Sequence, residues 1–506
     1  MSTENKTQET EIIDKDTLAL LKILSSGGKL TVDSTISDVD TSEAVLFHDQ
    51  NDEPYIAFNG NGSSVAPIDS KVSKMWLNKR CYEQYSKVLP SSGIKQVIDT
   101  LSAQAYFDGD QHKLSVRQAW VDGVLWYDLG SSAVSIDKNG WSITDTPPII
   151  FKRFAHQTPQ VSPKSGGDVR LLLNYVNITN PQEQLLFLVY VIAAFIPDFD
   201  HPLLIFSGPQ GAGKTTPMRV IKALIDPSLV SGTTIPKDVT AFIQAASHDS
   251  FIFFDNLSEM PEWFSDALAR ASTGDSFTKR KLYTDDDDII YYIQKAIALN
   301  GLTQVVTKGD LLDRAILLNL ERITTDKQKP KEKFWLEFEQ DRQLILGAIF
   351  DVLSKAMKLQ PSIKLSRLPR MADFAIWAYA IAEVAGFSGM DFITAYNENI
   401  KVQHDEALNA NPLAVAIIQF MQDREEWQGT ASQLYGPLEA IVKNLYLANK
   451  SGWVPNAAIL GKELRKLIPN LKARGIIVAI PPRSNNRTIT ITKLTDGTDG
   501  TDGRIG

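Results

Sequence analysis

Glycines, a lysine and two threonines stand at the spacing GxxxxGK[ST] in residues 203–216, LLIFSGPQGAGKTT. Glycine lets backbone N–H groups approach phosphate oxygens because it has no Cβ, and a helix that starts here adds the positive end of its dipole. Lys214 should reach the β- and γ-phosphates of ATP, and the hydroxyl of Thr215 should hold Mg²⁺. The pattern therefore predicts an ATP·Mg²⁺ site. Its binding residues are Gly208, Pro209, Gln210, Gly211, Ala212, Gly213, Lys214, Thr215 and Thr216.

An acid ends a second apolar run, FIFFDN, at residues 251–256. A carboxylate at the end of a buried strand suits Mg²⁺ or water coordination, so we predict that Asp255 and Thr215 hold the metal together. Many such ATPases place a glutamate next to this acid to polarise the attacking water, but here Asn256 stands there. Asparagine orients water and is a poor base, which makes Glu259 a candidate substitute. The alternative role for Asp255 is a helix cap or turn.

Two further polar residues adjoin apolar strand patterns. Asn300 ends AIALN and is predicted to align the lytic water beside the γ-phosphate; the alternative is a plain Asn300-Gly301 turn. Arg314, in GDLLDRAILLNL, falls between a helical segment and an apolar strand. In a ring of subunits such an arginine can project into the neighbour's nucleotide and stabilise transition-state charge. Its alternative role is an ion pair with Asp313 or another surface group.

The pattern around these residues predicts the sheet that positions them. From about residue 168 to 325, strands alternate with helical segments, which is typical of a parallel α/β sheet flanked by helices. The longest apolar run, residues 185–196, has twelve residues and is too short to span a bilayer. Polar and proline-containing flanks mark it as a buried core helix instead. We expect no membrane partner.

Composition limits the class of protein. The 506 residues carry a formal net charge of −8 and are 43% apolar, as in a globular protein of three or four domains. A single cysteine, Cys81, excludes a disulfide framework and a Cys-rich zinc site, and it indicates a reducing, cytoplasmic setting. Asp108, Asp110 and His112 in FDGDQH resemble a metal cluster, but we interpret FDGD as a turn between strands.

Changes in residue composition and pattern divide the chain outside the core into regions. We expect a disordered leader at 1–15, a mixed α/β region at 16–92 and a β-rich module at 93–165 that ends in a Pro/Ser/Gly linker at 156–167. The ATPase core at 166–325 is followed by a helical region at 326–410, a C-terminal unit at 411–495 and a disordered tail at 496–506.

The C-terminal unit is predicted to have helices followed by two strands, an order of elements that is typical of a winged helix. Asn411 caps the first helix with Pro412 at its first position, residues 456–467 form another, and Pro469 and Gly475 bracket a short third. Residues 455–494 hold eight Lys and Arg against one Glu, a net of +7 in an acidic chain. This basic face predicts nucleic-acid binding, with Arg483 and Arg487 in the wing reaching phosphates or the minor groove. The alternative is a winged helix used for protein contacts.

The order of phosphate loop, strand-end acid, strand-end asparagine and arginine resembles the ATPase core of superfamily 3 helicases. TGDSFTKRKLYTDDDD and LPRMADFAIWA also resemble the primase–helicases of phages and mobile islands. The resemblance implies an α/β P-loop AAA+ core and a homo-hexameric Mg·ATP motor that tracks single-stranded DNA in replication. By motif match it assigns Lys214, Thr215, Asp255, Asn300 and Arg314 to the active site. Duplex origin DNA and a primase or polymerase are further expected partners.

The resemblance also implies a basic hairpin that grips DNA. TKRKLY, residues 278–283, is the closest match, with Lys279, Arg280 and Lys281 as the DNA-binding residues; a solvated hairpin tip is the alternative. Arg370 is a second candidate to sense the γ-phosphate, unless it pairs with Asp373 one turn on. The main rival function is an AAA+ ATPase that remodels protein complexes or acts in phage defence, with the winged helix as adaptor.

Overall fold

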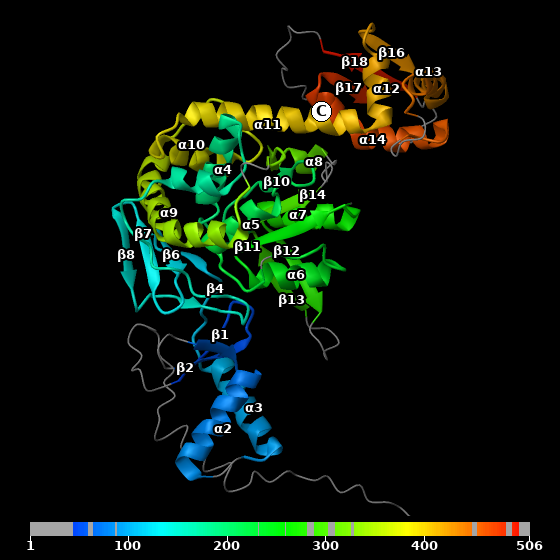
Figure 1. The fold of residues 1–506 in the computed structure, drawn as a ribbon. Coiled ribbons are helices and arrows are strands. Elements are labelled where there is room, and N and C mark those ends of the chain that lie inside the picture. The colour runs from blue at the N-terminus through cyan, green and yellow to red at the C-terminus, as the bar shows by residue number, and fades with distance from the viewer. Residues whose placement is uncertain are drawn as a thin grey trace, which may run out of the picture.

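The computed structural model describes residues 44–58, 64–86, 89–230, 232–258, 260–280, 288–301, 309–324, 328–447, 453–481 and 488–494. Figure 1 shows three parts in a row. An N-terminal unit lies at one end, an α/β core with a β-rich module lies in the middle, and a C-terminal unit lies at the other end. None of the helices within these ranges is both long and apolar enough to cross a membrane.

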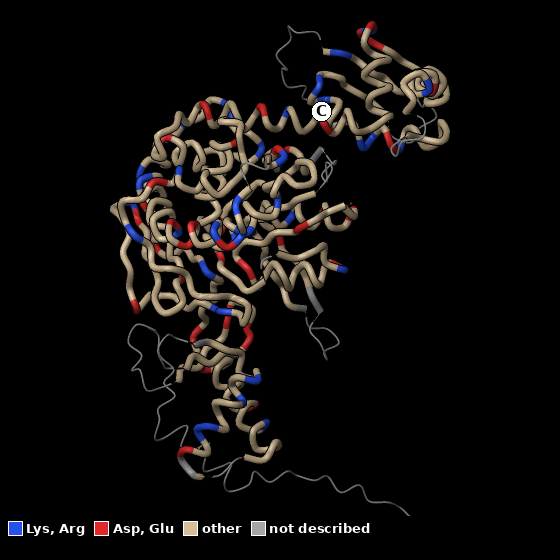
Figure 2. The backbone as a smooth tube through the Cα atoms, viewed as in Figure 1, with Lys and Arg blue, Asp and Glu red and all other residues tan. Residues whose placement is uncertain are grey.

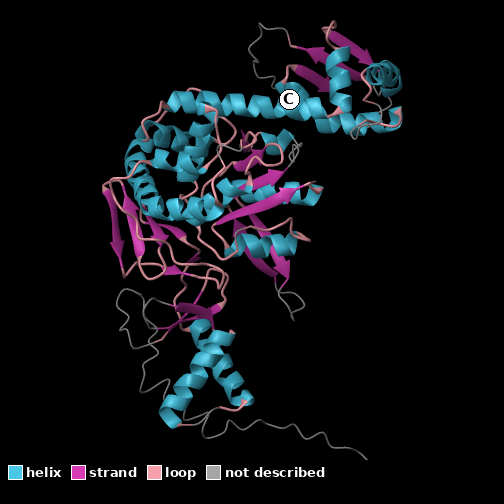
Figure 3. Cartoon of the chain, in the orientation of Figure 1, coloured by secondary structure: helices cyan, strands magenta, loops and turns pink. Residues whose placement is uncertain are grey.

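The core is built on a four-stranded parallel sheet of order β11–β14–β10–β15. Its strands are nearly continuous apolar runs, as expected of strands covered on both faces. Their bounds are β10 Leu203–Ser207, β11 Phe251–Leu257, β14 Ala296–Gly301 and β15 Ala315–Asn319. The expected parallel sheet flanked by helices is confirmed (Figure 3).

Alternate side chains along each strand enter two separate cores. Leu204 and Phe206 pack into the larger core, and Leu203 and Ile205 into the smaller. Helices of the larger core are α4 Pro181–Ala193, α5 Thr215–Ile225, α9 Lys331–Leu359, α10 Ala372–Val384 and α11 Gly389–Ala410, with the 3₁₀ turns η2 Val169–Tyr175 and η4 Gln360–Ser362 beside them. The smaller core is covered by α6 Val239–His248 and α7 Glu262–Thr273, with the short α8 Gly309–Leu312 before β15.

Helix α4 confirms the expected core helix. The side chain of Asn180 accepts hydrogen bonds from the N–H groups of Gln182 and Glu183, and Pro181 occupies the first helical turn, where its missing N–H costs little. Every residue from Leu185 to Ala193 is buried.

The N-terminal unit packs two helices on a small antiparallel sheet. Its elements are β1 Val45–His48, β2 Pro54–Phe58, β3 Ser64–Pro67, α2 Lys71–Tyr85 and α3 Ser91–Phe107. Leu101 of α3 packs in one cluster with Leu46 and Ile56, so this helix belongs to the N-terminal unit and crosses the boundary expected at residue 92.

The FDGD segment differs from the turn between strands that the sequence suggested. Helix α3 ends at Phe107 and the next strand begins only at Leu114. A Cβ on Gly109 would stand 2.5 Å from the carbonyl oxygen of Ala105, so glycine is needed for this close approach at the helix end. Among the described residues there is no group of three or more His, Cys, Asp and Glu side chains that could hold a metal ion.

The β-rich module is an antiparallel meander with a short parallel pair beside it. The meander strands are β5 Gln118–Val121, β6 Val124–Asp128, β7 Ala133–Asp137 and β8 Gly140–Thr144; the pair is β4 Leu114–Ser115 and β9 Ile150–Phe151. The expected linker after it is irregular but packed. The amide of Gln160 is buried and donates to the hydroxyl of Tyr127 and to the carbonyl of Leu224.

A buried ionic cluster joins the module to the helix that follows the phosphate loop. The guanidinium of Arg117 donates to Asp226 at 3.2 Å, and the ammonium of Lys222 donates to the other oxygen of Asp226 at 2.9 Å. Burial alone would raise the pKa of Asp226, but Lys222 and Arg117 hold this pKa well below its ordinary value. The module and the ATPase core therefore share one charged, water-excluded contact.

The C-terminal unit has the element order α12–β16–α13–α14–β17–β18, with a sheet of order β16–β18–β17. The bounds are α12 Pro412–Phe420, β16 Glu426–Gly429, α13 Ala431–Asn444, α14 Ala457–Ala473, β17 Ile476–Ala479 and β18 Ile489–Lys493. Asn411 caps α12 with Pro412 in its first turn, as expected. The two separate helices expected around Pro469 are wrong, because α14 runs through this proline to Ala473.

Candidate nucleotide site

The loop between β10 and α5 has the backbone that a phosphate cradle requires. Gly208, Gly211 and Gly213 all have positive φ angles, of 145°, 83° and 75°. A Cβ on Gly208 would stand 2.3 Å from the carbonyl oxygen of Leu320, and one on Gly213 would stand 2.9 Å from a methyl carbon of Ile323. Gly208 is therefore required by sterics as well as by conformation, and Gly213 chiefly by its positive φ.

The ammonium of Lys214 is folded over the same loop. It donates to the carbonyl oxygens of Gly208, at 2.6 Å, and Pro209, at 3.0 Å. Burial lowers the pKa of Lys214, and the nearby carboxylate of Asp255 opposes this effect. A cation held by neutral carbonyls is ready to exchange them for a phosphate oxygen.

Sheet order brings together three side chains that are far apart in the sequence. Strand β14 lies between β10 and β11, so Asn300 stands between the phosphate loop and Asp255. The amide of Asn300 donates to Oδ1 of Asp255 at 2.7 Å, and the hydroxyl of Thr215 donates to the same oxygen at 3.1 Å. Asn300 is only 2% exposed, so this contact is fixed in the sheet rather than made at the surface.

The pair of Thr215 and Asp255 fits a divalent cation. In an octahedral Mg²⁺ site with ligand distances of about 2.1 Å, neighbouring oxygens lie roughly 2.9 Å apart. The two side-chain oxygens are already 3.1 Å apart and both line a hollow of about 410 Å³. The other lining residues are 210–214, Thr216, Asn256 and Asn300.

A backbone irregularity in β11 favours asparagine as the residue at position 256. Strand β11 departs from regular register between Phe254 and Leu257, and Asn256 has a φ of +61°, in the left-handed region where asparagine is among the favoured residues. Its N–H donates to Oδ1 of Asn300 at 2.6 Å, and its exposed side chain borders the hollow. Glu259, the other candidate for positioning water, lies outside the described residues.

Three residues without any motif support the loop. The amide of Asn177 donates to the carbonyls of Ala212, at 3.4 Å, and Glu321, at 2.6 Å. The N–H of Ile323 donates to the carbonyl of Gly211 at 3.3 Å, and the N–H of Leu320 donates to that of Ser207 at 2.8 Å. The segment after β15 thus closes over the loop, a contact that no spacing in the sequence signals.

Arg314 lies at the opposite edge of the sheet from the phosphate loop. Its carbonyl accepts from the N–H of Leu203, the first residue of β10, whereas the loop follows the last. Its guanidinium donates to the carbonyl of Ala269 at 3.0 Å and to the hydroxyl of Thr273 at 3.2 Å, near the end of α7. The structure therefore does not bring Arg314 to the nucleotide site of its own chain.

Arg370 lies at this same edge. Its guanidinium pairs with Asp313, at 3.3 Å, which differs from the alternative partner considered for it, Asp373. His404 contacts the other oxygen of Asp313 at 2.7 Å. Neither Arg370 nor Arg314 therefore stands beside the cluster of Thr215, Asp255 and Asn300.

The expected basic hairpin has the predicted backbone. β12 Asp275–Arg280 and β13 Asp288–Ile293 are antiparallel, with Lys279 opposite Ile289 and Arg280 opposite Asp288. The side chains of Lys279 and Arg280 are not described, and Lys281 lies outside the described residues. Arg483 and Arg487 of the expected wing also lie outside them.

Comparison with known families agrees with this arrangement. Residues 169–406, which contain the phosphate loop, the acid and both arginines, match the model of AICE RepA, the actinomycete integrative conjugative element replication protein. Residues 413–501 match the AICE RepA C-terminal domain. Over these two stretches the chain matches the models of the AICE RepA family. The predicted relationship to replication proteins of mobile elements is confirmed.

Solved structures give distant similarities. The apo C-terminal region of NrS-1 is 12% identical, with a TM-score of 0.41 over 95% of this chain and 100% of that one. The active helicase Cch of SCCmec type IV is 13% identical, with a TM-score of 0.43 over 89% of this chain and 93% of its own. No curated protein matches the chain.

Proposed function

We propose that this chain is an ATP-dependent DNA helicase, or replication-initiator motor, that moves along single-stranded DNA as a ring. The observation that carries the proposal is the cluster of Thr215, Asp255 and Asn300 facing the glycine loop. A metal-binding pair beside a buried amide is what hydrolysis of a bound triphosphate needs. The core is then of the AAA+ type, and ATP with Mg²⁺ is its substrate and cofactor.

Each residue of the cluster has a distinct task in this proposal. Lys214 and the loop N–H groups bind the β- and γ-phosphates. Thr215 and Asp255 would hold Mg²⁺, which would supply positive charge to the phosphates. Asn300 orients the attacking water, and Asn256 or Glu259 completes its position.

In this proposal the two arginines reach a nucleotide only when the subunits form a ring. Since Arg314 lies at the edge of the sheet away from its own phosphate loop, it acts on the nucleotide of the neighbouring subunit in this proposal. Arg370 lies at the same edge through its ion pair with Asp313, so it belongs to the same face between subunits. A homo-hexamer places this face against the next loop.

The DNA contacts come from two places. In the β12–β13 hairpin, Lys279 and Arg280 at the end of β12 and Lys281 after it in the sequence bind the phosphates of the translocating strand in this proposal. The C-terminal unit, whose element order is that of a winged helix, binds duplex origin DNA. Figure 2 shows cations along α14, and Lys462, Arg465 and Lys466 are all exposed there. Arg483 and Arg487 add the wing contacts.

Strand displacement from a forked duplex tests the proposal. With Mg·ATP the full chain should release a labelled strand, and Lys214→Ala should not. The triple change of Lys279, Arg280 and Lys281 to alanine should abolish displacement. A control that removes two exposed cations elsewhere, Lys355 and Lys358 of α9, by change to alanine should unwind normally. Displacement that survives loss of the hairpin cations would show that other residues grip the strand. No displacement by the wild type, with ATP still hydrolysed, would favour a remodelling ATPase over a DNA motor.

A further inference from the structure

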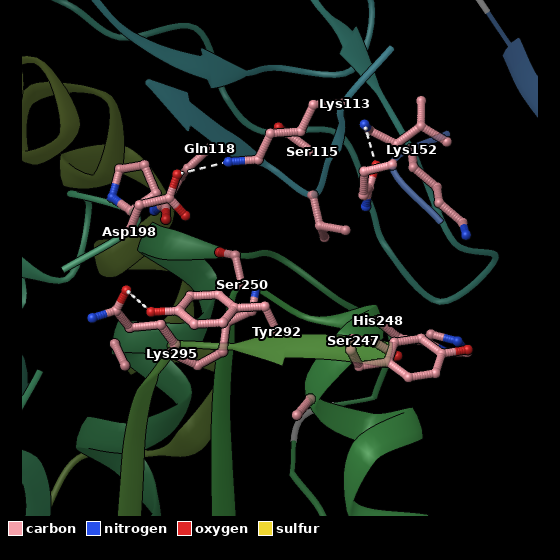
Figure 4. A pocket seen from close by; sticks show the side chains of 18 of the residues that line it. Lys113, Ser115, Gln118, Lys152, Asp198, Ser247, His248, Ser250, Tyr292 and Lys295 are labelled. Carbon is pink, nitrogen blue, oxygen red and sulfur yellow. Dashed lines mark hydrogen bonds and ion pairs between the residues drawn. The ribbon is translucent and has the colours of Figure 1, made fainter. Parts of the chain in front are cut away.

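A second cavity, of about 500 Å³, lies at the edge of the sheet opposite the phosphate loop, where β10, β11 and β14 begin. Its wall comes from three parts of the fold: the β1–β2 turn, the strands β4 and β5 with the segment after β9, and the core residues that precede β10, β11 and β14. Strand β13 of the hairpin closes one side. Figure 4 shows Lys113, Ser115 and Gln118 on the module side, and Ser250, Tyr292 and Lys295 on the core side.

The deep part of this cavity holds polar groups without partners. Ser250 is 5% exposed, and its hydroxyl has no hydrogen bond among the described residues. His201 is 3% exposed, and its Nδ1 likewise has no partner there. Leaving a buried polar atom unsatisfied is costly, and such atoms in a native fold indicate a missing ligand or water.

Lys295 is the available cation of the cavity. Three lysines line it, but Lys113 pairs with Asp198 at 2.9 Å and Lys152 donates to the hydroxyl of Tyr55 at 2.6 Å. For Lys295, the described part of the chain provides no hydrogen bond or ion pair to its ammonium. Burial lowers the pKa of Lys295, and the carboxylates of Asp226, Asp198 and Asp249 oppose this effect without outweighing it.

The two acids that line the cavity are already occupied. Asp198 accepts from Lys113, and Oδ1 of Asp49 accepts from the N–H groups of Asn51 and Glu53. Asp198 still attracts Lys295 at longer range, but neither acid forms an ion pair with its ammonium within the described part of the chain, so an anion from outside can approach it.

The entrance adds an aromatic face and continuity with the hairpin. Tyr292 of β13 is 63% exposed, and Ile290, two residues earlier on the same face of the strand, is 55% exposed. Lys113 at the module side is exposed as well. An exposed aromatic ring beside buried cationic and hydroxyl groups suits a nucleotide, because bases stack on aromatic rings and phosphates take cations and hydroxyl donors.

We propose that this cavity binds one nucleotide unit of a single DNA strand that leaves the β12–β13 hairpin. Lys295 and Ser250 bind its phosphate, and Tyr292 stacks on its base. This inference rests on the proposed DNA motor, since the hairpin must deliver the strand. It adds a contact between the strand and the junction of the β-rich module and the core, away from the ATP site.

Binding of a fluorescent oligothymidylate to the full chain, with a non-hydrolysable ATP analogue and Mg²⁺ present, tests the inference. Lys295→Met keeps the stem and removes the charge; it should weaken affinity roughly 3- to 10-fold and reduce the salt dependence by about one phosphate contact. Tyr292→Leu should weaken affinity by a similar factor. Because Tyr292 is exposed, its loss leaves the fold intact. Lys138→Met, in the exposed β7–β8 turn, is the control and should bind as the wild type.

A competition with thymidine monophosphate separates the sources of the phosphate. If the monophosphate binds the wild type but not Lys295→Met, while both variants bind the strand normally, the cavity serves a free nucleotide and the inference is overturned. Normal strand binding by both variants without any monophosphate binding also overturns it. Failure of the wild type to bind the strand would overturn the proposed function itself.

Discussion

The amide of Asn300 donates a hydrogen bond to Asp255 at 2.7 Å, and its carbonyl oxygen accepts the N–H of Asn256 at 2.6 Å. One side chain on β14 thus fixes both residues at the end of β11. Asp255, which would hold the metal, and Asn256 beside it are therefore both tied to the strand next to the phosphate loop.

Replacing Asn300 should therefore impair hydrolysis more than nucleotide binding. Asn300→Ala removes the donor to Asp255 and leaves the N–H of Asn256 without its acceptor, and kcat should fall roughly 100-fold. Asn300→Asp restores the acceptor but places a second carboxylate against Asp255, so it should not rescue activity. Steady-state ATP hydrolysis together with ATP affinity measures both effects. Asn139→Ala in an exposed turn is the control; unchanged kcat in Asn300→Ala would contradict the assignment.

Two glycine-to-alanine changes with similar backbone strain, one inside the glycine loop and one outside it, test whether the loop binds the phosphates. Gly213→Ala combines a φ of +75° with a Cβ that meets Ile323 at 2.9 Å, so ATP affinity should fall at least about 10-fold. Gly166→Ala has a similar φ, +84°, but its Cβ would meet no atom within 4 Å. Gly166→Ala should lower the free energy of unfolding by about 1–2 kcal/mol through backbone strain, and it should leave ATP affinity unchanged. Equal ATP affinities for the two variants would show that the loop does not bind the phosphates.

Mixing two inactive variants tests whether Arg314 acts between subunits. Arg314→Ala should lower kcat by about 10³-fold or more, and Lys214→Ala should be inactive. An equimolar mixture should recover activity, because some interfaces then pair an intact loop with an intact arginine. Thr273→Val, which removes one hydrogen bond of Arg314, controls for its contacts with α7. Full activity of Arg314→Ala alone, or no recovery on mixing, would refute this role.

Glu183 should make stability depend on pH near neutrality. Burial, reinforced by Glu406, raises the pKa of Glu183 to about 7 from an ordinary value near 4.5, although the N–H of Asn319 donates to it. The folded chain then holds this proton more tightly than the unfolded chain, so stability falls as pH rises from about 4.5 to 7. After allowance for its partial exposure, the loss should be on the order of 1 kcal/mol. Urea unfolding at pH 5 and pH 8 should show this loss in the wild type and in the exposed Glu332→Gln, but not in Glu183→Gln.

The local parts of the fold were predictable from sequence. The glycine loop, the buried helix α4 with its Asn180 cap, β1, β2 and the C-terminal hairpin all follow from short-range patterns. The sequence did not predict helix α14 as one element, because Pro469 normally ends a helix. Tertiary packing of Leu467 and Leu471 holds the helix together across this proline.

The long-range parts of the site were not predictable. Asn300 was selected for its position at a strand end, but the bond that joins it to Asp255 depends on sheet order, which a sequence pattern does not specify. Arg370 pairs with Asp313, 57 residues away, a contact that helical spacing does not signal. Closure of the loop by Leu320 and Ile323 likewise depends on where the chain turns after β15.

The most direct test of the central claim is steady-state ATP hydrolysis with and without single-stranded DNA, with Lys214→Ala as the blank. A DNA motor should hydrolyse Mg·ATP several-fold faster when the strand is present, and the blank should show no turnover in either condition. Hydrolysis that is indifferent to DNA would contradict the motor. ATP binding without turnover would instead indicate an initiator gated by nucleotide, with Asn256 as the residue that replaced the catalytic base.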